Sequence, residues 1–166
     1  MSLPSIKNLA LFALGALLMT ACGKEDTSLP SSPTITQGIY GTVVERWGDW
    51  QPHPGSTVNA GETPIANDIY VYKYTTLSDF NSLPYDENGI LRFSIDSMPY
   101  PLVVTTTSAS NGFYQIQLPA GHYSVLLLEN GILYSCGFDS NVGLMPVTVD
   151  SGQVVRFNLV LDHAIY

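Results

Sequence analysis

The clearest hydrophobic pattern in the chain lies between residues 113 and 131. Apolar and polar residues alternate up to residue 118, with Gln115 and Gln117 on the polar side, and the alternation resumes after a Pro-Ala-Gly connection at 119–121. A period of two is typical of a β-strand with one buried face, so this stretch predicts two strands joined by a tight connection. The residues predicted to point into the core are Tyr114, Ile116, Leu118, Tyr123, Val125 and Leu127.

Other short β-rich runs, separated by turn signals, recur along the chain. They lie at 39–46, 68–76, 101–107, 132–136, 144–149 and 153–161. No amphipathic helix of useful length is present in the pattern. About seven or eight short strands with regular turns predict an all-β fold, an antiparallel β-sandwich of the immunoglobulin-like or transthyretin-like kind.

The N-terminus has a different pattern. An apolar run of 11 residues, Leu9–Met19, follows Lys7 and ends in small residues before Cys22. A transmembrane helix needs about 20 apolar residues, so the run is too short to span a bilayer. Residues 1–21 therefore read as a signal peptide, either a lipoprotein signal or an ordinary secretory signal beside which Cys22 is incidental.

The residues Met19-Thr20-Ala21-Cys22 resemble the lipobox of bacterial lipoproteins, with Met in place of Leu. The resemblance implies cleavage before Cys22 by signal peptidase II and lipidation of its thiol and new amine. Several acyl chains on one residue give stable anchoring. Cys136 is then a lone thiol, for which we expect a buried core position.

Lys24, Glu25 and Asp26 follow the cysteine directly. This cluster resembles the signal that sends Bacteroidota lipoproteins to the outer face of the outer membrane. A plain solvated tether is the alternative. Residues 22–37 are rich in Ser, Thr and Pro and are predicted to form an extended tether to a domain at 38–162.

That domain resembles the carboxypeptidase-regulatory-like domains of transthyretin type, which show Asn-Gly, then x-Tyr-x-Ile, then Leu-Pro-x-Gly-x-Tyr-x-Val. The matching residues are Asn111, Gly112, Tyr114, Ile116, Leu118, Pro119, Gly121, Tyr123 and Val125. The segments 41–45, 63–72 and 149–162 resemble further strands of the family. The resemblance implies a sandwich and says little about function.

Two departures from the family pattern bear on the fold. Asn67 and Asp68 replace a Gly-Ala pair, which leaves the inward register of that strand open, and residues 76–100 form a long insertion. Strict alternation also turns Leu126 and Leu128 away from the core. We expect the insertion to cover them.

The net charge and the absence of known catalytic motifs limit the classes of function that we expect. Six Lys and Arg residues stand against 14 Asp and Glu, a formal charge of −8, which disfavours nucleic acid as a partner. His53, His122 and His163 are far apart and form no zinc motif, and Asp139–Gly143 reads as a turn rather than a calcium loop. We expect no enzyme, no metal and no cofactor.

The segment 46–55 is the candidate binding loop, because Trp47 and Trp50 lie three residues apart beside a strand end. Exposed rings would suit stacking on sugars, whereas rings that close the end of the sandwich would be packing residues. We therefore predict a non-catalytic, lipid-anchored binding or structural/adhesive module at the cell surface, with a glycan or a surface protein as partner. A carbohydrate-binding accessory lipoprotein is the alternative, and a hydrolase with an unrecognised site is a remote one.

Overall fold

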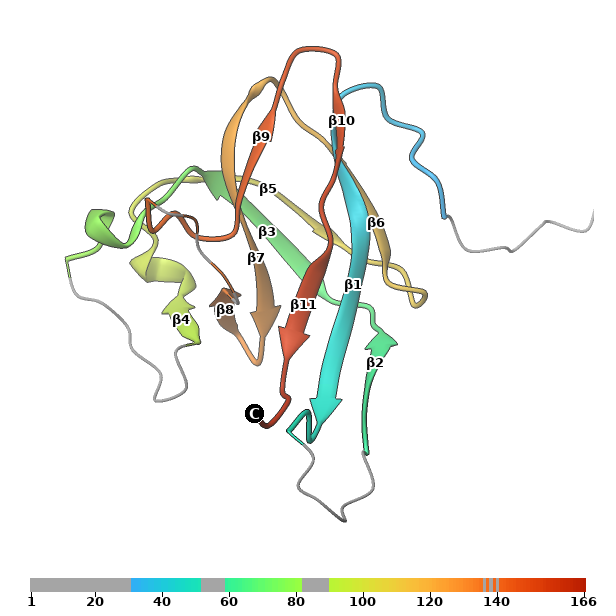
Figure 1. The fold of residues 1–166 in the computed structure, drawn as a ribbon. Coiled ribbons are helices and arrows are strands. Elements are labelled where there is room, and N and C mark those ends of the chain that lie inside the picture. The colour runs from blue at the N-terminus through green and yellow to red at the C-terminus, as the bar shows by residue number, and fades with distance from the viewer. Residues whose placement is uncertain (1–30, 52–58, 82–89, 136, 138, 140) are drawn as a thin grey trace, which may run out of the picture.

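β-Strands make up most of the part of the chain that the structure describes (Figure 1). The structure is a computed structural model and describes residues 31–51, 59–81, 90–135, 137, 139 and 141–166. The predicted signal peptide (1–21), lipidation site (Cys22) and export signal (24–26) lie outside these residues, as does Cys136. The elements are β1 (Gly38–Gly48), β2 (Ala60–Pro64), β3 (Asp68–Lys73), η1 (Leu77–Asp79), β4 (Leu91–Ser94), η2 (Ile95–Ser97), β5 (Leu102–Thr107), β6 (Phe113–Gln117), β7 (Gly121–Glu129), β8 (Ile132–Ser135), β9 (Pro146–Val149), β10 (Val154–Arg156) and β11 (Leu159–Asp162).

The first sheet is built around the long strand β1. β6 and then β2 pair with one side of it in antiparallel fashion, while β10 and then β11 pair with the other side in parallel. The predicted purely antiparallel arrangement is therefore wrong for this sheet. The turn after β9 places β10 beside the start of β1. There the Gly38 amide donates to the Gln153 carbonyl (2.9 Å). Both strands then run in the same direction.

The run 153–161, predicted as one strand, is broken at Phe157 and Asn158. The Phe157 amide donates to the Tyr40 carbonyl (2.7 Å), and the Phe157 carbonyl accepts a hydrogen bond from the buried Tyr114 hydroxyl. A Cβ atom on Gly41 would lie 2.0 Å from that carbonyl oxygen. The close approach of the bulge to β1 therefore requires glycine at position 41.

The second sheet has the order β4-β8-β7-β3-β5, with β9 also pairing with β7. All its pairings are antiparallel. β4 belongs to the insertion and β2 to a polar run, and neither was predicted. Both are short and lack a long alternating pattern. Together with the break of the run 153–161 into β10 and β11, they bring the described residues to eleven strands rather than seven or eight.

The main core lies between the two sheets and confirms the predicted register. All six residues predicted to point inward are buried in it, whereas Gln115 is half-buried and Gln117 exposed. Ile69 and Val71 of β3 also enter this core, with no exposed surface. This settles the register of the strand that follows Asn67.

A second core covers the outer face of the second sheet. Tyr72, Leu126 and Leu133 are buried there together with Phe93 of the insertion. The segments around η1 and η2 supply further apolar cover, and the Phe80 ring stacks on Phe93 with centroids 4.7 Å apart. The insertion lies on the side of β7 and β8 away from β1 (Figure 1). It therefore covers Leu126 and packs against Leu128, as predicted.

The end of the predicted tether also contacts the sandwich. The Thr34 amide donates to the Gln115 side chain (2.8 Å), and the Gln37 side-chain amide donates to the Leu118 carbonyl (2.8 Å). The amide of Gly152 donates back to Gln37 (2.8 Å). From residue 31 onward the chain thus lies along the outer face and edge of the first sheet, and residues 22–30 of the predicted tether lie outside the described residues.

Candidate functional site

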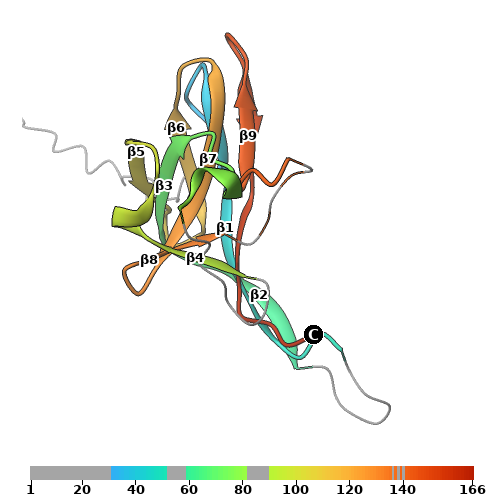
Figure 2. The same cartoon turned by 90° about the vertical axis from the view of Figure 1, so that its left-hand side faces the viewer.

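One end of the first sheet extends past the second sheet. Figure 2 shows the ends of β1 and β2 and the C-terminus projecting beyond the other strands. The C-terminal residues are hydrogen bonded to β1 through the His163 amide, which donates to the Arg46 carbonyl (2.8 Å), and the Ile165 amide, which donates to the Gly48 carbonyl (2.9 Å). The Trp50 amide donates to Ile165 (2.9 Å). The described part of the candidate loop, residues 46–51, is therefore held by residues 163–165, and residues 52–55, which include His53, lie outside the described residues.

Trp47 and Trp50 are both partly exposed at this end, at 39% and 42% of their surface. The Trp47 ring covers Gly61 of β2, and its indole N–H donates to the Thr63 hydroxyl (3.2 Å). The Trp50 N–H donates to the Trp47 carbonyl (3.2 Å), and the Arg46 guanidinium lies 5.0 Å from the Trp50 ring centroid. Each ring is thus fixed in place while part of it remains open to solvent.

The two rings do not form one flat platform. Successive side chains of a strand point to opposite faces, so Arg46 and Trp47 lie on opposite sides of the β1–β2 ladder. Trp50 lies against Arg46, whereas Trp47 lies against Gly61. A ligand that used both rings would have to wrap around the sheet end, so they act as two separate aromatic surfaces.

Arg46 connects three segments at this end. Its guanidinium pairs with Glu62 of β2 (2.7 Å) and Asp162 of β11 (3.3 Å), and it donates to the Tyr166 hydroxyl (3.2 Å). The hydrogen bond to Tyr166, followed by that to Glu62, raises the pKa of Arg46 above its ordinary value. Sequence reasoning missed this network, since its partners lie 16 to 120 residues away.

His163 connects the two sheets. Its ring nitrogens lie 2.9 Å from Glu45 of β1 and 2.5 Å from Glu129 of β7, and Arg92 of β4 lies 3.5 Å from Glu129. Burial lowers the pKa of His163, but hydrogen bonds and charge from Glu45 and Glu129 outweigh it, so the pKa is raised. The protonated ring donates to both carboxylates.

Away from this end, a groove of about 400 Å³ lies beside β3 and β7, and we call it the Lys73 groove. It is lined by Lys73, Tyr74, Tyr100, Ala120, Gly121, His122 and Tyr123. The rings of Tyr74 and His122 stack in it with centroids 3.8 Å apart. The Tyr74 and Tyr100 hydroxyls donate to Asp139 and Asp79, each at 3.1 Å, which places two carboxylates at its margin.

The carboxylate of Asp139 also accepts hydrogen bonds from within its own turn, residues 139–143. It accepts the amide N–H groups of Gly143 (2.8 Å) and Asn141 (2.9 Å). The Gly143 amide is the largest cause of a lowered Asp139 pKa. These contacts are those of an Asx turn, in agreement with the sequence interpretation.

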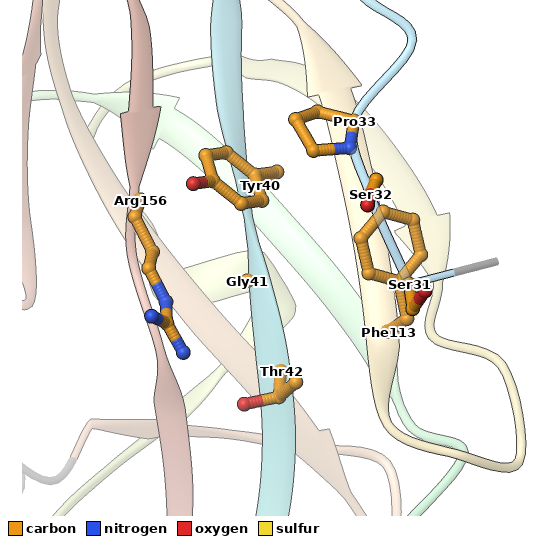
Figure 3. A pocket seen from close by; sticks show the side chains of 8 residues that line it. All are labelled: Ser31, Ser32, Pro33, Tyr40, Gly41, Thr42, Phe113 and Arg156. Carbon is orange, nitrogen blue, oxygen red and sulfur yellow. The ribbon is translucent and has the colours of Figure 1, made fainter.

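A second groove, which we call the Arg156 groove, lies on the outer face of the first sheet and has a volume of about 240 Å³ (Figure 3). It is lined by Ser31, Ser32, Pro33, Tyr40, Gly41, Thr42, Phe113 and Arg156. The segment 31–33 and the buried Phe113 ring form one side of it, and Arg156 forms the other. Neither groove was predicted, since each joins segments that are distant in sequence.

Comparisons of the chain with protein-family models, curated proteins and solved structures found no match. The resemblance to carboxypeptidase-regulatory-like domains therefore stays a prediction. Among the described residues, no group of three or more His, Cys, Asp or Glu side chains could hold a metal ion. Within the same residues, no helix has the length and apolar character needed to cross a membrane.

Proposed function

We propose that this chain is a non-catalytic, lipid-anchored binding module of the cell envelope, held in the outer membrane and facing the cell exterior. The observation that carries the binding role is the projecting end of the first sheet, where two tryptophan rings are braced by hydrogen bonds and still about two-fifths exposed. Large aromatic surfaces that are fixed and exposed are typical of recognition sites. The lipobox-like sequence before Cys22 and the charges at 24–26 support the location.

Carbohydrate is the ligand class that these rings favour. Indole faces stack on the apolar faces of sugars, and each such contact contributes about 1 kcal/mol. Two separate rings, at about 2 kcal/mol together, therefore suit weak binding in the range of tens of millimolar to a polymer that touches the domain at several points. Many copies on one cell surface would raise the overall avidity.

An adhesive or structural role is the second candidate, and strand β5 favours it. β5 is an edge strand of the second sheet, and Leu102 and Val103 are 45% and 39% exposed on it. An uncharged edge with exposed apolar residues can pair with a strand from another protein.

The binding role is tested with soluble protein that begins at Thr27. Titration with neutral polysaccharides should change tryptophan fluorescence, and Trp47→Ala or Trp50→Ala should each weaken binding while leaving the melting temperature within a few degrees of wild type. Ile132→Ala, which removes another exposed apolar side chain (44% exposed), is the matched control. Loss of stability in both tryptophan variants, with no polysaccharide bound by the wild type, would identify the rings as packing residues.

The anchor is tested by Cys22→Ala, with Cys136→Ala as the matched control. Native protein and the control should incorporate a fatty-acid probe and sediment with membranes, and Cys22→Ala should do neither. Protease treatment of intact cells should remove the domain if it faces outward. Membrane association of unlabelled Cys22→Ala would contradict the anchor.

A further inference from the structure

The Arg156 groove brings together an arginine, several hydroxyls and an aromatic ring. Tyr40 and Thr42 project from the same face of β1, and the parallel register places Arg156 of β10 directly beside Tyr40. Figure 3 shows the Tyr40 and Thr42 hydroxyls directed toward the side on which the Arg156 guanidinium lies. Ser31 and Ser32 add two hydroxyls from the opposite side of the groove.

Arg156 has no carboxylate partner among the described residues. Of the four cationic Lys and Arg side chains in this part of the chain, Arg46 and Arg92 form ion pairs, whereas Arg156 and Lys73 do not. None of the eight described residues that line the Arg156 groove is acidic. In a chain with a formal charge of −8, an arginine kept apart from acids beside a groove is free to bind an external anion.

We propose that the Arg156 groove binds a carboxylate-bearing sugar, such as a hexuronate residue of an acidic polysaccharide; this inference rests on the proposed carbohydrate-binding function and names its ligand class. The planar guanidinium of Arg156 holds the carboxylate with paired hydrogen bonds. The hydroxyls of Thr42, Ser31 and Ser32 bond to the ring hydroxyls, and the half-buried Tyr40 ring supplies a stacking surface.

The Lys73 groove does not offer the same chemistry. The carboxylates of Asp79 and Asp139 lie within hydrogen-bond distance of its Tyr100 and Tyr74 hydroxyls and disfavour an anionic ligand. Lys73 is also an exposed cation without an ion pair among the described residues, so Lys73→Gln removes the same charge as Arg156→Gln from another groove. It is a matched control for the effect of net charge.

The test measures binding of alginate oligosaccharides, which consist of hexuronates, to soluble protein from Thr27 onward by isothermal titration at two salt concentrations. The comparison ligand is the same oligosaccharide after chemical reduction of its carboxyl groups. We expect Arg156→Gln to weaken alginate binding about tenfold or more, because a charge-assisted bidentate contact is lost. Arg156→Lys should restore only part of the affinity, and Lys73→Gln should change it less than about twofold.

Several outcomes overturn the proposal. Equal weakening by Arg156→Gln and Lys73→Gln would show that only net charge matters. Equal binding of alginate and its reduced form would show that the groove does not recognise the carboxylate. Unchanged alginate binding by an Arg156→Gln variant that melts like wild type would show that the Arg156 groove is not the binding site. Either result would leave the Trp47 and Trp50 surfaces as sites for neutral polysaccharides. Failure of both charged and neutral polysaccharides to bind would overturn the carbohydrate function as well.

Discussion

Leu126→Ala tests whether the insertion forms a second core. Leu126 has no exposed surface, although it points away from the main core, and it packs in a cluster with Tyr72, Leu133 and Phe93. Removing a fully buried leucine side chain loses its transfer free energy and leaves a cavity, which together cost about 2–5 kcal/mol. For a domain of this size, a loss of about 3 kcal/mol lowers the melting temperature by roughly 10 °C.

The matched control is Leu102→Ala, the same substitution on another strand of the same sheet. Leu102 is 45% exposed, so its replacement should change stability by about 0.5 kcal/mol or less. Both variants are measured by urea unfolding of the soluble domain, with the two tryptophans as fluorescent reporters and unchanged m-values as evidence of the same transition. Similar midpoints for the two variants would show that residues 76–100 do not cover Leu126, and the second core would have to be abandoned.

Two further predictions concern the end of the sandwich and the bulge in its last strands. Because the pKa of His163 is raised in the folded state, its stabilising contribution is complete below the unfolded pKa of about 6.5 and is lost as pH rises through the folded value. Urea unfolding between about pH 6 and 9 should therefore show a decline in wild type that His163→Gln lacks, and a constant difference between the two would exclude this linkage. Gly41→Ala should destabilise the domain by about 1–3 kcal/mol or more, because the added Cβ would lie 2.0 Å from the Phe157 carbonyl oxygen. Gly131→Asn, at a left-handed position with open space around it, should leave the melting temperature nearly unchanged, and equal effects of the two changes would refute the close approach.

The main core could be predicted because its signal is local. Alternation at period two depends only on neighbouring residues, and in β6 and β7 one face of each strand enters the space between the sheets. The same alternation showed that Leu126 needed cover, since a strand with apolar residues on both faces must be buried on both. The insertion was the one long segment without a predicted place, which made it the natural cover.

Other features could not be predicted, because they depend on contacts between distant segments. Parallel pairing of β1 with β10 and β11 follows from where the chain crosses between the sheets, and no local pattern records that crossing. The residues that fix the Trp50 loop are also remote: Arg46 bonds to Asp162 and Tyr166, which are 116 and 120 residues away. Trp47 and Trp50 were selected as candidates from the sequence and both are partly exposed, but their placement on opposite faces of the ladder required the strand geometry.

The distribution of the two cores explains where ligand sites can exist on this domain. The insertion packs apolar side chains over Tyr72, Leu126 and Leu133 on the outer face of the second sheet, so that part of the face is used for stability. The first sheet has no such cover in the described residues apart from segment 31–37, and its outer face carries polar side chains such as Thr42 and Arg156. The projecting end of the same sheet holds the exposed tryptophans.

A polysaccharide that followed the outer face of β1 would pass from the Arg156 groove toward Trp50, which lies over Arg46 on that same face. The separate tests of Arg156 and Trp50 would therefore show coupled effects if one long ligand uses both, and independent effects if each binds its own.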